Sequence, residues 1–132
     1  MGIIDKFRKK NPESELKQLL EMQEALHTVM SGDGGVDADE LPNGVGPFGF
    51  DPNNPIPCKT TLGSMAYLER LHTVAGVKVQ AERIGSFGSE VVDSPIDGYK
   101  LTDSNGADLG TIFISPYQGR ISNKAPEGFK LI

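Results

Sequence analysis

The chain has 132 residues and a formal net charge of −5, with 37% hydrophobic residues and no tryptophan. That length fits one ordinary domain, and the slight excess of acid excludes the class of general nucleic-acid binders, which need a surplus of lysine and arginine to neutralise phosphates. No hydrophobic run approaches the roughly 18 residues of a membrane-spanning helix and no signal peptide is visible, so we expect a cytoplasmic protein.

Residues 1–10 are the first element that the pattern predicts. They put Ile3, Ile4 and Phe7 on one face of a short helix and basic residues on the rest of its surface. Such a segment would attach to a membrane surface, or it would be the solvated start of a helix that docks Phe7 on protein. We expect the second arrangement and keep peripheral membrane attachment as an alternative.

A longer amphipathic helix is predicted to begin after Asn11 and to complete an N-terminal helical segment over residues 1–31. Asn11 suits the N-cap and Pro12 the first helical position, and Ser31-Gly32 ends the helix. Its apolar stripe consists of Leu16, Leu19, Leu20, Leu26 and Val29, with Met30 at its end. An isolated helix of this length is marginal in water, so the stripe needs a partner: the rest of the chain, a second copy or another protein.

The next segment, residues 32–47, is rich in glycine and acid and is predicted to be a flexible linker. Its acidic residues are Asp33, Asp37, Asp39 and Glu40. A calcium-binding EF-hand loop that started at Asp33 would need glycine at its sixth position and glutamate at its twelfth, where Ala38 and Gly44 stand. We therefore expect no metal site.

Residues 48–132 are predicted to form one compact α+β domain, with a small antiparallel sheet of three to four strands and one packed helix. We expect residues 48–57 to lie extended along this domain, because their aromatic and aliphatic side chains would otherwise expose apolar surface. The helix is predicted to start at Ser64, its N-cap, and to end at Gly76.

Four strand segments are predicted after the helix. They cover residues 77–84, 98–103, 109–115 and 129–132. The first alternates apolar and polar residues, as a half-buried strand does. Asn105-Gly106 predicts a tight hairpin between the second and third, and in the third Ile112 and Ile114 share one face while Phe113 points to the other.

A nucleophilic active site would need a nucleophile with a base beside it. Cys58 is the single cysteine of the chain, which excludes an intramolecular disulfide and a cysteine-rich zinc site. His72 lies in the predicted domain helix, and no motif joins it to Cys58. We expect Cys58 to be a small buried side chain and the protein to have no catalytic residues and no cofactor, so an enzyme is the less favoured class.

Polar residues gather in two turns of the predicted domain, where binding groups often lie beside a rigid sheet. The candidate ligand-binding residues are Arg83, Ser86, Tyr117, Arg120, Ser122 and Lys124. Arg83 and Arg120 would bind an anionic group if the two turns met in one concave site. This predicts, as an alternative function, a small enzyme or small-ligand receptor.

Short motifs spread over the predicted domain form a pattern of their own. They are Asn54-Pro-Ile-Pro57 near its start, Arg83 with Gly85-Ser86 in its middle, and Ala125-Pro-Glu-Gly-Phe129 near its end. In these motifs, residues 48–132 resemble a family of small bacterial domains of uncharacterised function. The resemblance implies a domain boundary near residue 48 and a bacterial origin, and it implies no activity, because none is established for that family.

The leading hypothesis from the sequence is a non-enzymatic protein-interaction module. Its partner-binding element would be the predicted N-terminal helix, which would present its stripe to another protein or to a second copy of the chain.

Overall fold

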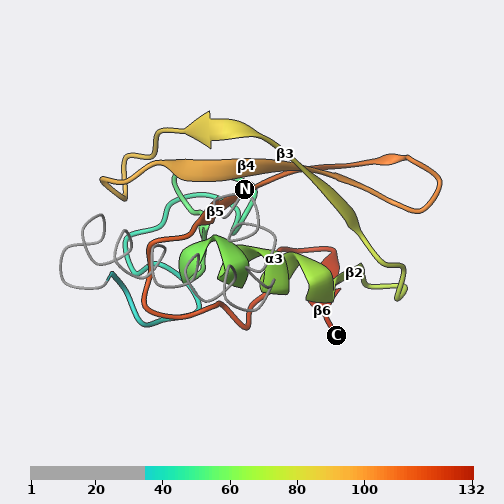
Figure 1. Ribbon diagram of the computed structural model, residues 1–132, viewed down its shortest axis with the longest axis horizontal. Helices are drawn as coiled ribbons and strands as arrows, with labels where there is room; N and C mark the ends of the chain where they lie inside the picture. The colour runs from blue at the N-terminus through green and yellow to red at the C-terminus, as the bar shows by residue number, and fades with distance from the viewer. Residues whose placement is uncertain (1–34) are drawn as a thin grey trace, which may run out of the picture.

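The computed structural model describes residues 35–132, so the predicted helical segment 1–31 and the first residues of the predicted linker lie outside the described residues. Within the described part, the domain is α+β, with one helix and two sheets (Figure 1), and the predicted class is confirmed. The elements in chain order are β1 (Ile56–Pro57), α3 (Thr60–Arg70), β2 (Leu71–Thr73), β3 (Gln80–Phe87), β4 (Ile96–Thr102), β5 (Asp108–Ser115) and β6 (Phe129–Leu131).

The main sheet has four strands in the order β1-β5-β4-β3, and it is mixed rather than antiparallel as predicted. The short strand β1 pairs in parallel with β5, with Ile56 opposite Ile114. A parallel pair needs a crossover connection, and here α3 and three strands lie between β1 and β5 in the chain. The predicted last strand exists as β6, but it pairs with β2 in a separate two-stranded sheet.

The β4–β5 hairpin confirms the turn that the sequence predicted. Gly106 has a φ of 83°, a conformation that glycine adopts without steric cost. The Asp103 carboxylate accepts hydrogen bonds from the backbone N–H groups of Asn105 and Ala107, at 2.8 and 2.9 Å. Local turn chemistry therefore fixes the register of these two strands.

The helix and the strand after it differ from their predicted bounds. Helix α3 starts earlier than Ser64 and ends at Arg70, because Leu71 is extended, fully buried and paired with Leu131. Gly76, the predicted end of the helix, instead turns the chain between β2 and β3 with a φ of 89°. Burial of Leu71 against the C-terminal strand overrides the helical periodicity that predicted a longer helix.

Helix α3 lies against one face of the main sheet, and the core fills the space between them (Figure 1). Ile112 and Ile114 of β5 point into this core, whereas Phe113 points to the outer face, as predicted. Phe48 and, in β1, Ile56 belong to the core, so residues 48–57 pack on the domain as expected. Residues 48–54 form successive turns, however, rather than the extended chain that was predicted. The remaining buried members are Cys58, Tyr67, Leu71, Val79, Tyr99 and Leu101.

Candidate functional site

An open groove lies between α3 and the edge strand β3, with a volume of about 460 Å³. Ala81 stands opposite Leu101 in the β3–β4 register, so both side chains lie on the face of the sheet that α3 covers. Leu101 is fully buried, but Ala81 is exposed. The helix therefore covers the middle of the sheet and leaves the inner face of its edge strand open.

The groove exposes more apolar than polar surface, although half of its ten lining residues, among them Glu69, Lys78 and Gln80, are polar or charged. On α3, Thr61, Met65 and Leu68 follow one another at helical spacing of four and three, so they share one face. Met65 is 58% exposed, although it is a large hydrophobic side chain. Val79 and Ala81 line the opposite wall. Seven of the eight residues of β3 are exposed, which is unusual for a strand that shares a sheet with buried neighbours.

Arg83 closes one end of the groove. Its guanidinium bonds to the Asp97 carboxylate, with Nη2 2.9 Å from Oδ1, and to the Ser86 hydroxyl at 2.8 Å. Tyr99 lines the same end, and burial is the main cause that raises the pKa of its phenol. The positive charge of Arg83 is therefore compensated inside the domain.

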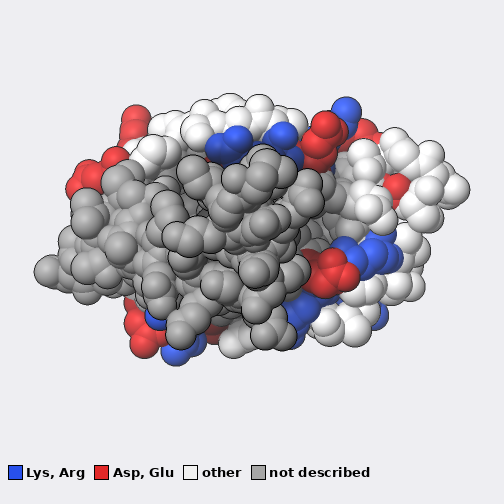
Figure 2. Space-filling model, viewed as in Figure 1, with Lys and Arg blue, Asp and Glu red and all other residues white. Residues whose placement is uncertain are grey.

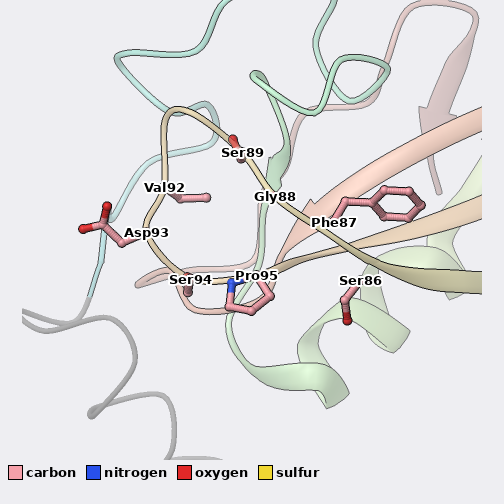
Figure 3. A pocket seen from close by; sticks show the side chains of 8 residues that line it. All are labelled: Ser86, Phe87, Gly88, Ser89, Val92, Asp93, Ser94 and Pro95. Atoms are coloured by element: carbon pink, nitrogen blue, oxygen red, sulfur yellow. The ribbon is translucent and has the colours of Figure 1, made fainter.

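A second hollow, of about 310 Å³, lies inside the loop between β3 and β4 (Figure 3). Figure 3 shows the carboxylate of Asp93 pointing away from the loop, with Val92 pointing across it. The Phe87 ring packs edge-on against Phe113, with ring centroids 5.3 Å apart. This hollow lacks the converging polar groups that a small-ligand site needs.

Arg120 and Lys124 form a separate cluster with the acidic segment that the sequence assigned to the linker. Arg120 Nε lies 2.7 Å from Asp37 Oδ1, and Lys124 Nζ lies 2.5 Å from Glu40 Oε2. The hydrogen bond from Lys124 is the largest cause that lowers the pKa of Glu40. The Ser122 hydroxyl donates to the backbone carbonyl of Asp39 at 2.6 Å.

For residues 35–47, these contacts correct the prediction of a flexible linker over residues 32–47. Val36 N–H donates to the Gln118 side chain at 2.7 Å, and Leu41 is only 3% exposed. Residues 35–47 are therefore part of the folded domain, which includes the described chain from residue 35 rather than from residue 48. Glycine and acidic content indicated flexibility, but the partners that hold this segment lie some 80 residues away in sequence.

We expect Ser122→Ala to destabilise the domain more than Arg120→Ala. Ser122 is fully buried, and the change leaves the carbonyl of Asp39 without its donor, which costs about 1–3 kcal/mol. The Arg120 pairs are exposed, so solvent screens them and their loss is expected to cost less than the loss of the buried hydrogen bond, and less still at high salt. Urea denaturation at low and high salt measures both. If Arg120→Ala instead lowered the free energy of unfolding more than Ser122→Ala, and by an amount that depended on salt, the ion pairs would be the main interaction that holds the acidic segment.

The six predicted ligand-binding residues fall into two groups. Arg83 and Ser86 are hydrogen-bonded on β3, whereas Arg120, Ser122 and Lys124 hold the acidic segment. Figure 1 shows β3 at the edge of the sheet and the segment after β5 on the opposite side of α3. Tyr117 belongs to that segment and forms a β-bridge with Lys59. Arg83 and Arg120 lie in different turns, and each is paired with a carboxylate of the domain. The two arginines therefore do not form one site for an anion.

Cys58 and His72 also lie apart. Cys58 precedes α3 and His72 follows it, and a helix of eleven residues is about 16 Å long. The His72 Nδ1 atom is 2.8 Å from the carbonyl of Arg70, and burial raises the pKa of the Cys58 thiol to about 12. Residues 35–132 contain no group of three histidine, cysteine or acidic side chains placed to hold a metal ion.

The surface visible in Figure 2 mixes basic and acidic residues over the described part of the chain. No helix within residues 35–132 is long and apolar enough to cross a membrane. Comparisons of the chain with models of known protein families, with curated proteins and with solved structures gave no match. Of the two hollows described above for residues 35–132, the α3–β3 groove is the one with the more apolar lining.

Proposed function

We propose that this protein is a non-enzymatic protein-interaction module and that the α3–β3 groove is its docking surface for an amphipathic helix. The observation that carries the proposal is the uncovered inner face of β3, where Ala81 is exposed, together with Met65 of α3, which is exposed on the facing wall of the groove. Small ligands are bound by pockets with a few converging polar groups, whereas an open apolar groove suits the stripe of a helix.

The size of the groove supports a helical occupant. From Thr61 to Glu69 the α3 wall extends about 12 Å, a length that two turns of a docked helix cover. Ala81 has a short side chain on the opposite wall, so a second helix would approach the strand closely. The apolar stripe from Leu16 to Val29 has the spacing that such a groove accepts.

A synthetic peptide of residues 12–32 is the probe that tests this proposal. It would be titrated against the full chain carrying Leu19→Asp and Leu26→Asp, which break the chain's own stripe. We expect saturable binding in the micromolar range, measured by the fluorescence anisotropy of the labelled peptide.

Two neighbouring positions on β3 provide matched variants for that titration. Ala81→Arg fills the groove, whereas Glu82→Arg places the same side chain on the opposite face of the sheet. Ala81→Arg is expected to weaken peptide binding at least about tenfold, and Glu82→Arg to leave it within about twofold. No saturable binding, or equal binding by the two variants, would overturn the proposal.

The other two hypotheses from the sequence, an anion-binding site and membrane attachment, remain predictions. A small enzyme or anion receptor would use Arg83 and Arg120, which each bind a carboxylate of the domain. Membrane attachment through residues 1–10 lies outside the described residues. We further propose a cytoplasmic location, as expected from the sequence, and a bacterial origin, from the resemblance.

A further inference from the structure

Met65 is a large hydrophobic side chain that the fold leaves in solvent on the α3 wall of the groove. It is 58% exposed, although Ser64 just before it is fully buried and Tyr67 two positions later is 1% exposed. Met65 therefore lies at the edge of the face by which α3 packs on the sheet. Its side chain contributes more to the lining of the groove than to the core.

The described part of the chain contains two sulfur atoms, those of Cys58 and Met65, and they differ in accessibility. Cys58 is fully buried, and burial raises the pKa of its thiol to about 12, so the thiolate that reacts with oxidants is scarce. The thioether of a methionine has no proton to lose, and its reaction needs only access to the sulfur. Within residues 35–132, Met65 is therefore the sulfur site that an oxidant reaches first.

The reaction of Met65 with a hydroperoxide is a transfer of one oxygen atom and two electrons. A lone pair of the thioether sulfur attacks one peroxide oxygen, the O–O bond breaks and an S–O bond forms. The sulfur is oxidised to a sulfoxide, and the other oxygen takes up the proton and leaves as water or as an alcohol. Methionine sulfoxide reductases reverse the change with two thiols, which form a disulfide while the oxygen leaves as water. The side chain can thus alternate between an apolar and a polar form.

The cationic groups that line the groove are already bonded within the domain. Lys78 Nζ donates to two backbone carbonyls, at 3.1 and 2.9 Å, and Arg83 pairs with Asp97. A sulfoxide oxygen at Met65 would be hydrated in the free protein, but a docked apolar stripe would remove that water. Burial of a polar oxygen without a hydrogen-bond partner is expected to weaken binding by about fivefold to a hundredfold.

We infer that Met65 is a site of reversible oxidation and that its sulfoxide form weakens the binding of an amphipathic helix at the α3–β3 groove. The inference rests on the proposed function and adds its regulation by a peroxide. The fold itself should tolerate the change, because the altered side chain is exposed whereas Tyr67 of the core is buried. The oxidised protein would therefore stay folded and lose affinity.

Peptide mass mapping of the full chain tests the site of oxidation. Folded protein and protein unfolded in urea are treated with hydrogen peroxide, and the gain of one oxygen at Met65 is followed with time. We expect the folded chain to react within about fivefold of the unfolded rate, because the side chain is exposed. A slower reaction of the folded chain, or oxidation of Cys58 ahead of Met65, would overturn the inference whatever the groove binds.

The labelled peptide of residues 12–32 measures the effect on binding. The full chain carrying Leu19→Asp and Leu26→Asp is oxidised, the peroxide is removed with catalase, and the peptide is then titrated. We expect the affinity to fall at least about fivefold and to return after treatment with a methionine sulfoxide reductase and dithiothreitol. An unchanged affinity overturns the inference. A fall in affinity that accompanies unfolding, as followed by circular dichroism, also overturns it.

Met65→Leu is the matched variant, because it keeps an apolar side chain of similar volume and lacks the sulfur. The other methionines, Met1, Met22 and Met30, precede the described residues and are present in both proteins. Whatever the affinity of Met65→Leu before treatment, peroxide should change it by less than about twofold. An equal loss in both proteins would assign the effect to another methionine and overturn the inference. If the peptide failed to bind before oxidation, the proposed function and its regulation would both be overturned, whereas the mass mapping would still decide the site of oxidation.

Discussion

Ile112→Ala is expected to lower the free energy of unfolding by about 2–5 kcal/mol. Ile112 is fully buried at the centre of β5, opposite Tyr99 of β4. Truncation to alanine removes apolar surface from the core and leaves a cavity that the rigid sheet does not fill. Urea denaturation followed by circular dichroism measures the change.

Phe113→Ala is the matched control for this change, because Phe113 is the next residue of the same strand. Its ring lies on the outer face, where it is only half-buried and touches Phe87. We expect Phe113→Ala to lower the free energy of unfolding less than Ile112→Ala does, since the aromatic pair contributes only about 0.5–1.5 kcal/mol beyond its buried area. A loss as large as that of Ile112→Ala would mean that the outer face is also a core, and the sheet would need a covering layer there.

The parts of the fold that the sequence predicted are those that local chemistry determines. The β4–β5 hairpin follows from Asn105-Gly106, and the alternation of Ile112, Phe113 and Ile114 assigns each side chain to a face of the sheet. These signals act over a few residues and do not depend on the rest of the chain.

The parts that the sequence did not predict depend on distant partners. The C-terminal end of α3 is set by the pairing of Leu71 with Leu131, and β1 forms because Ile56 meets Ile114. Arg120 lies 83 residues beyond Asp37, the partner that fastens the acidic segment. The local sequence around Asp37 does not show that its partner is Arg120. The prediction of a linker therefore rested on composition alone.

The sequence also did not predict the α3–β3 groove, because the groove depends on how two separate elements pack. Alternation over residues 77–84 predicted a half-buried strand, but the strand is Gln80–Phe87 and seven of its eight residues are exposed. Burial of its inner face depends on how far α3 extends across the sheet. Val79 is buried whereas Ala81 is exposed. The available signal was Met65, which lies on the predicted apolar face of α3 and is exposed in the structure. Only the arrangement of helix and sheet shows that this face is incompletely covered.

The Cys58 thiol is expected to react with an aromatic disulfide at pH 8 about a thousandfold more slowly in the folded protein than in urea. Burial raises its pKa from 9.0 to about 12, although hydrogen bonds from Ser122 and Ser64 partly oppose the shift. At pH 8 the thiolate fraction falls from about one tenth to about one in ten thousand, and the thiolate is the reacting form. A folded protein that reacts within tenfold of the unfolded rate would contradict this burial.

The same shift makes stability depend on alkaline pH. Because the folded state holds the Cys58 proton more tightly than the unfolded state, its contribution is complete below about pH 9 and is lost as the pH rises toward 12. Tyr67 and Tyr99 also have raised pKa values from burial, so they contribute to the alkaline loss of stability. Comparison with Cys58→Ala separates the contributions, since this variant keeps both tyrosines and lacks the thiol. Its free energy of unfolding should fall less steeply between pH 9 and 11 than that of the native sequence, and parallel curves would assign the alkaline loss to the tyrosines alone.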